Sequence, residues 1–119
     1  ESRFPLALLT NKPDRSTRRI LDGLGLARFF DPARVVCGDG PFPRKPHPAG
    51  LLGLAAAANA SPHEVVLVGD SVVDRATARA AGAISCVASY GFGFETFPMD
   101  ELEAGAWIID TPSQLASLL

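Results

Sequence analysis

The chain has 119 residues, of which 47% are hydrophobic, and a formal net charge of −2. This length predicts a domain with a hydrophobic core of its own, and the near-neutral charge provides no basic field for binding nucleic acid. The longest apolar runs are far shorter than a membrane span, so we expect neither nucleic acid nor a membrane as a partner.

Apolar runs and helical patterns alternate along the chain. The first apolar run, residues 5–10, predicts a buried strand, and apolar spacing then predicts a helix from Asp14 to Leu24. Further strands are expected at 33–38, 64–70, 83–91 and 106–110, and further helices at 49–60, 71–81 and 111–119. A Gly- and Phe-rich loop is expected at 91–100. Near-continuous apolar strands that alternate with helices predict an α/β fold, a three-layer Rossmann-like parallel sheet with helices on both faces.

The two cysteines, Cys37 and Cys86, lie far apart in the sequence and outside any CxxC pair. We expect two buried free thiols, with a disulfide as the alternative. Free thiols are typical of a cytoplasmic protein.

Ligands of parallel sheets bind at the carboxyl ends of the strands. The site is therefore expected just after Thr10, Gly38, Gly69 and Ser89.

Thr10 and Asn11 follow the first strand and precede a helix. Their hydroxyl and amide groups can donate hydrogen bonds to an anion. The simpler alternative is a capping turn before the helix that begins at Asp14.

The loop at 38–48 contains four prolines and presents Arg44 and Lys45. Lys12 and Lys45 are the only lysines in the chain, and both lie in loops that follow strands. An ammonium group on a stiffened loop suits a phosphate or a carboxylate, and Arg44 is a further candidate for substrate contact. The alternative for Lys45 is a solvated cation.

Asp70 ends the third strand, and Asp74 lies in the first turn of the next helix. Two carboxylates near one face suit Mg²⁺, which takes one or two carboxylates together with waters and substrate oxygens. Charge compensation at the helix start is an alternative that explains Asp74 well and Asp70 poorly. Taken together, the metal acids, the lysine and the Thr-Asn pair predict a pocket for a phosphoryl group.

Three segments resemble the haloacid dehalogenase superfamily of phosphatases, and most of all its phosphoglycolate phosphatase branch. LALLTNKP resembles the second motif of that family, RKPHP the third, and VGDSVVDRATARAAG the fourth. The resemblance implies catalytic roles for Thr10, Asn11 and Lys45, and metal-binding roles for Asp70 and Asp74. It also implies Mg²⁺-dependent hydrolysis of a small phosphomonoester, a phosphorylated metabolite similar to phosphoglycolate, through an aspartyl-phosphate.

The first motif of the family, an Asp-x-Asp that supplies the nucleophile, does not occur in the sequence. We therefore expect residues 1–119 to be the C-terminal part of the core domain, without the central nucleophile-bearing strand and the cap. Such a chain is expected to be inactive alone and to exchange a strand or associate with the missing N-terminal part. The alternative is a non-catalytic phosphate- or metal-binding module of the same fold.

A serine esterase is a weaker alternative, because Ser71 also follows a strand. Such enzymes need a histidine downstream of the serine, whereas both His47 and His63 precede Ser71. The sequence also has no GxSxG elbow.

Overall fold

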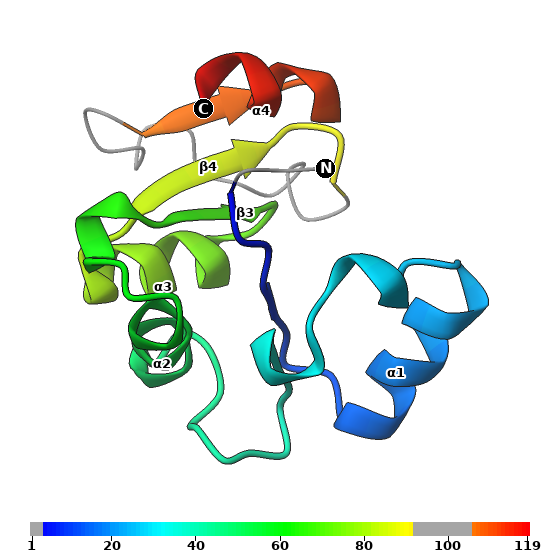
Figure 1. Ribbon diagram of the computed structural model, residues 1–119. Helices are drawn as coiled ribbons and strands as arrows, with labels where there is room; N and C mark the ends of the chain where they lie inside the picture. The colour runs from blue at the N-terminus through cyan, green and yellow to red at the C-terminus, as the bar shows by residue number, and fades with distance from the viewer. Residues whose placement is uncertain (1–3, 92–105) are drawn as a thin grey trace. The chain divides into compact units, whose positions relative to one another are not determined.

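The computed structural model describes residues 4–91 and 106–119, and these form two compact units, residues 1–60 and 61–119 (Figure 1). Hydrogen-bonded strand pairs in the described residues form two parallel sheets, one in each unit. The predicted α/β organisation with parallel strands is therefore confirmed. No helix in the described residues is long and apolar enough to cross a membrane.

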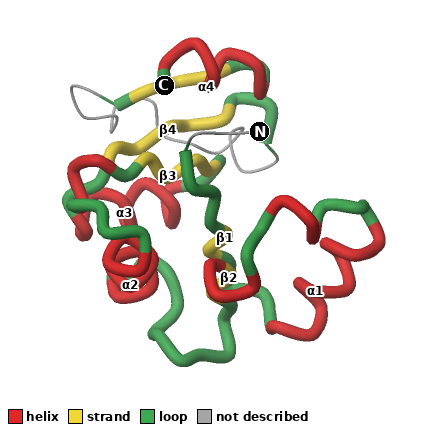
Figure 2. Tube along the Cα trace, viewed as in Figure 1, coloured by secondary structure: helices red, strands yellow, loops and turns green. Residues whose placement is uncertain are grey.

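The first unit, residues 1–60, contains two short strands (Figure 2). Its elements are β1 (Leu8–Leu9), α1 (Asp14–Gly23), the 3₁₀ turns η1 (Ala27–Phe29) and η2 (Pro32–Arg34), β2 (Val35–Val36) and α2 (Ala49–Ala57). β1 and β2 pair in parallel, with Leu8 opposite Val35 and Leu9 opposite Val36. Both strands are shorter than predicted. At β2 the reason is local, because the Asp31 carboxylate accepts a hydrogen bond from the Ala33 amide and starts a 3₁₀ turn where a strand was expected.

Helix α2 buries one apolar face in the first unit. Gly50, Leu51, Leu54 and Ala55 are buried. A Cβ atom at Gly50 would lie 2.9 Å from Cδ1 of Leu9, so the glycine lets the helix approach β1 closely.

The second unit, residues 61–119, contains a three-stranded parallel sheet in the order β3-β4-β5. Its elements are the 3₁₀ turn η3 (Pro62–Glu64), β3 (Val66–Gly69), α3 (Val72–Ala81), β4 (Ile84–Ala88), β5 (Trp107–Ile109) and α4 (Pro112–Leu118). α3 packs against β3 and β4, and α4 against β5. The core comprises Cys86, Ala88 and Ile109, with Val66, Trp107 and Leu115 packed against it.

Several sequence predictions about local structure are confirmed. α3 ends before Gly82, whose φ of 78° is left-handed, as expected of a glycine after a helix. Cys37 and Cys86 are free and buried. Most of the Gly- and Phe-rich loop predicted at 91–100 lies outside the described residues.

Candidate functional site

The predicted site residues lie at the carboxyl ends of strands in both units. Thr10 and Asn11 follow β1, Lys45 lies in the loop after β2, and Asp70 and Asp74 follow β3. All five are half-buried, so their side chains are held by the fold and remain within reach of a ligand.

Thr10 continues the strand pairing and begins a turn. Its amide donates to the carbonyl of Val36 over 3.0 Å, and its hydroxyl oxygen accepts from the Lys12 amide over 3.1 Å. The hydroxyl is the acceptor in this second bond, so its own proton can still be donated to an anion. This turn does not cap the helix, because the Asp14 amide is bonded to Asp39 instead. The Thr10 hydroxyl therefore remains suited to the functional role.

Asn11 ties the end of β1 to the loop that carries Lys45. Its Nδ2 donates to the Lys45 carbonyl over 3.1 Å, and its Oδ1 accepts from the Lys45 amide over 2.9 Å. The Asn11 carboxamide therefore binds both the main-chain amide and the main-chain carbonyl of Lys45. The main chain of Lys45 is fixed by these two bonds, and the second N–H of the carboxamide can be given to a ligand.

Gly38 allows the two strand-end loops to touch. Its amide donates to the carbonyl of Lys12 over 2.7 Å, and its own carbonyl accepts from Nε of Arg44 over 3.2 Å. A Cβ atom at this position would overlap the main-chain carbonyl of Asn11. Since a backbone atom cannot swing aside, a side chain here would push the Thr10–Lys12 turn away from the loop.

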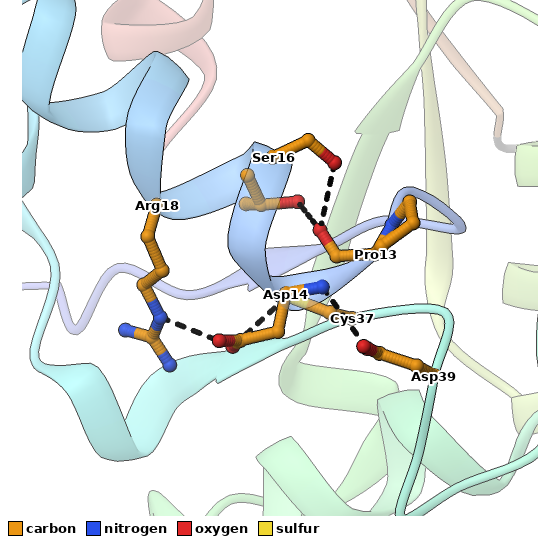
Figure 3. Close-up of polar contacts among 7 residues, drawn as sticks. Pro13, Asp14, Ser16, Arg18, Cys37 and Asp39 are labelled. Carbon is orange, nitrogen blue, oxygen red and sulfur yellow. Dashed lines mark hydrogen bonds and ion pairs between the residues drawn. The ribbon is translucent and has the colours of Figure 1, made fainter.

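Figure 3 shows how the start of α1 is held next to these loops. Pro13 precedes the helix and has no side-chain oxygen, so Asp39 caps it instead and accepts from the Asp14 amide over 3.0 Å. The Asp14 carboxylate accepts from Nε of Arg18 over 3.1 Å and from the Cys37 thiol over 3.7 Å. Burial raises the pKa of the Cys37 thiol, and the charge of Asp14 raises it further. This thiol is therefore a protonated donor at neutral pH and has a structural role.

Asp74 holds the backbone at the end of β3. Its Oδ2 accepts from the Asp70 amide over 3.1 Å and from the Ser71 hydroxyl over 3.2 Å. These bonds connect the first turn of α3 to the two residues that precede it. Both bonds fall on one oxygen, so they also fix the direction of the carboxylate.

Two glycines enclose the carboxylates of the second unit. A Cβ atom at Gly69 would overlap Asp74, and a Cβ atom at Gly91 would overlap Asp70. The two acidic side chains thus lie directly against bare backbone. Close packing of this kind restricts the orientations that each carboxylate can adopt.

The donor set around Asp70 and Asp74 fits a hard cation. The described residues contain no group of three or more His, Cys, Asp or Glu side chains placed to hold a metal. A pair of carboxylates is nevertheless the usual protein contribution to an Mg²⁺ site, since that ion keeps several waters and takes substrate oxygens. The oxygens present here are therefore suited to Mg²⁺ and unsuited to metals that prefer thiolate or imidazole.

The esterase alternative finds no support in the second unit. The Ser71 hydroxyl donates to Asp74, which follows the C-terminal end of β3. His63 is exposed and lies in η3, before the N-terminal end of that strand. It is therefore poorly placed to act as a base for Ser71.

Comparison with known proteins identifies the family. The family model for haloacid dehalogenase-like hydrolases matches residues 1–82. The chain belongs to the haloacid dehalogenase-like hydrolase family. The resemblance inferred from the three motifs is thereby confirmed.

Relatives of this chain include phosphoglycolate phosphatases. The chain is 45% identical over 91 residues to the phosphoglycolate phosphatase of Rhodospirillum rubrum, a match that covers 76% of this chain and 36% of that protein. It is 38% identical over 91 residues to the phosphoglycolate phosphatase of Escherichia coli K12, over 76% and 35% of the two chains. The chain thus spans about a third of the length of these relatives, and it is phosphoglycolate phosphatase-like in sequence.

A solved structure of similar fold supports the same family. A "predicted phosphoglycolate phosphatase" of Haemophilus somnus 129PT aligns with a TM-score of 0.84 at 28% identity, over 97% of this chain and 49% of that one. The parallel strands and helices of this chain therefore match the Rossmann-like core of the family.

Two contributors to the site were not found by sequence reasoning. Gly38 lets the main chain of Asn11 approach closely, and Asp39 caps a helix that begins 25 residues earlier in the chain. A glycine next to a strand end was a usable signal for Gly38. Nothing local in the sequence indicates which helix Asp39 caps.

Proposed function

We propose that residues 1–119 are the C-terminal part of a haloacid dehalogenase-like core domain, within a cytoplasmic phosphatase. The whole enzyme hydrolyses a small phosphomonoester of the phosphoglycolate type and requires Mg²⁺. The observation that carries this proposal is the paired hydrogen bonding of Asn11 to Lys45, which fixes a motif lysine beside a motif threonine at one strand end. The match to the family model and the phosphoglycolate phosphatase relatives support it.

In this proposal the first unit binds the phosphoryl group. The Lys45 ammonium and the Thr10 hydroxyl contact phosphoryl oxygens, and Asn11 positions Lys45 and offers its second N–H. Such fixed donors lower the barrier because they need no reorganisation as charge shifts onto the oxygens.

The carboxylates of the second unit hold the metal. Asp70 and Asp74 bind Mg²⁺, and Asp74 is already oriented by its bonds from the Asp70 amide and the Ser71 hydroxyl. The ion supplies positive charge that neutralises the phosphoryl oxygens.

The nucleophile comes from outside the 119 residues, because the sequence contains no Asp-x-Asp. A carboxylate oxygen of that aspartate forms a bond to phosphorus, the bond from phosphorus to the alcohol oxygen breaks, and the alcohol takes a proton from a general acid. Water then hydrolyses the aspartyl-phosphate to carboxylate and inorganic phosphate.

In this proposal the missing nucleophile strand pairs with an open edge of a described sheet. Within the described residues β1 pairs only with β2, and β3 only with β4, so each has an edge that a further strand can use. The N-terminal part of the enzyme, or a strand exchanged from another copy, supplies it.

A non-catalytic module that binds phosphate or metal is the second candidate. The absence of Asp-x-Asp from the sequence favours it, since every other motif residue can bind without performing chemistry.

Phosphate release distinguishes the two candidates. The 119-residue chain and the longer protein that contains it are each given 2-phosphoglycolate, with Mg²⁺ and with chelator. We expect phosphate release by the longer protein with Mg²⁺ only, and none by the 119-residue chain. Binding of inorganic phosphate by the longer protein without any turnover supports the module, and turnover by the 119-residue chain contradicts the external nucleophile.

A further inference from the structure

The turn that follows β4 lies directly against Asp70. A Cβ atom at Gly91 would overlap three atoms of that aspartate, namely Cβ, Cγ and Oδ2. Overlap with the carboxylate alone could be relieved by rotation of the side chain. Overlap with Cβ cannot, because the backbone of Asp70 holds that atom. A side chain at position 91 must therefore displace the whole aspartate or the turn itself.

The requirement for glycine at this position is one of space. The glycines with positive φ in the described residues are Gly25, Gly40 and Gly82, and Gly91 is not among them. The φ of Gly91 is therefore not one that favours glycine, and the contact with Asp70 is what excludes a side chain.

The turn is anchored on its other side to β5. The Ser89 amide donates to the carbonyl of Ile109 over 2.9 Å, and the Ser89 hydroxyl donates to the Asp110 carboxylate. The Gly91 amide donates to the carbonyl of Ala88 over 3.2 Å, which closes the turn. The hydrogen bonds that fix the position of Gly91 therefore do not involve Asp70.

We propose that Gly91 is a positioning residue that sets the direction of the Asp70 carboxylate toward a bound divalent cation, with the Ser89–Asp110 hydrogen bond as its anchor. This inference rests on the proposed metal-binding role of Asp70 and Asp74. Residues that orient a metal ligand without touching the metal usually matter for affinity, and their loss weakens binding about 10- to 100-fold.

The test is Mg²⁺ titration of the longer protein by calorimetry, for the unaltered protein and for its Gly91→Ala, Ser89→Ala, Gly23→Ala and Asp70→Asn variants. Gly23→Ala is the matched control, since it adds the same methyl group where nothing lies within 4 Å. Circular dichroism and thermal unfolding of each chain report the fold separately. We expect Gly91→Ala to weaken Mg²⁺ binding about tenfold or more, Ser89→Ala to weaken it less, and Gly23→Ala to leave it unchanged.

The outcomes separate the two levels of the proposal. Equal Mg²⁺ affinity of folded Gly91→Ala and Gly23→Ala chains overturns the positioning role and leaves the metal site standing. If Gly91→Ala does not fold, the Mg²⁺ affinity of Ser89→Ala tests the proposal instead. An unaltered Mg²⁺ affinity in that variant overturns the positioning role of the turn. Absence of Mg²⁺ binding by the unaltered protein, or binding that Asp70→Asn does not weaken, overturns the metal site and the positioning role with it.

Discussion

The carboxamide of Asn11 binds both the amide and the carbonyl of Lys45, 34 residues later in the chain. The lysine is therefore placed through its main chain. The same logic holds in the second unit, where Asp74 fixes the backbone at Asp70. In both units one motif residue positions another.

Asn11→Ala removes both bonds to Lys45. Each hydrogen bond contributes about 0.5–1.5 kcal/mol, so we expect a loss of about 1–3 kcal/mol in the free energy of unfolding. Urea unfolding followed by circular dichroism measures it. Ser16→Ala is the control, because it removes one exposed hydrogen bond within the first turn of α1. If both substitutions lower the free energy of unfolding equally, the bonds between Asn11 and Lys45 stabilise the fold no more than one exposed hydrogen bond does.

Lys45→Met in the longer protein removes the ammonium and keeps the main-chain bonds to Asn11. If this ammonium contacts the phosphoryl group, kcat falls about 10²- to 10³-fold, as for other lost electrostatic contacts in a site, while the unfolding temperature stays nearly constant. Lys12→Met is the matched control, since Lys12 is exposed and its main chain is bonded in the neighbouring turn. Comparable activity of the two variants would remove Lys45 from the catalytic residues.

Substitutions of Asp74 separate its two roles. Asp74→Asn keeps an oxygen that accepts from the Asp70 amide and the Ser71 hydroxyl, but loses the charge. We expect Mg²⁺ binding to weaken strongly while stability falls by about 1 kcal/mol or less, the usual size of a lost charge at a helix start. Asp74→Ala also loses both hydrogen bonds and should be about 1–3 kcal/mol less stable than Asp74→Asn. Full Mg²⁺ affinity in Asp74→Asn would leave Asp74 with a structural role only.

The order of the elements and the family could be predicted from the sequence, because apolar runs, helix spacing and motif letters are local patterns. Gly82 is an example, since a glycine after an Ala-rich helix predicts a left-handed helix end. The ends of the strands could not be predicted, since hydrogen bonding to a neighbour decides them. Residues 5–9 are apolar throughout, yet only Leu8 and Leu9 form a strand. The contacts of Gly38 and Gly91 depend on folding, which brings segments distant in sequence together.

The buried thiol of Cys86 is expected to make the free energy of unfolding fall at alkaline pH. Burial raises the pKa of its thiol above the value of 9.0 expected in the unfolded chain. The folded state therefore keeps a proton that the unfolded state loses, and stability falls as pH rises above 9.0. We expect the free energy of unfolding of Cys86→Ala to decline less steeply between about pH 8 and 10 than that of the unaltered chain. Urea unfolding across this range measures both slopes, and identical slopes would show that the thiol does not contribute.

The most direct test of the central claim is the coding sequence upstream of Glu1. If the chain is the C-terminal part of a phosphatase, the reading frame continues upstream and encodes an apolar strand that ends in Asp-x-Asp, followed by a helical insertion. A start codon in frame immediately before Glu1 would contradict the account. The residues around Asn11, Lys45, Asp70 and Asp74 would then form binding sites that perform no chemistry.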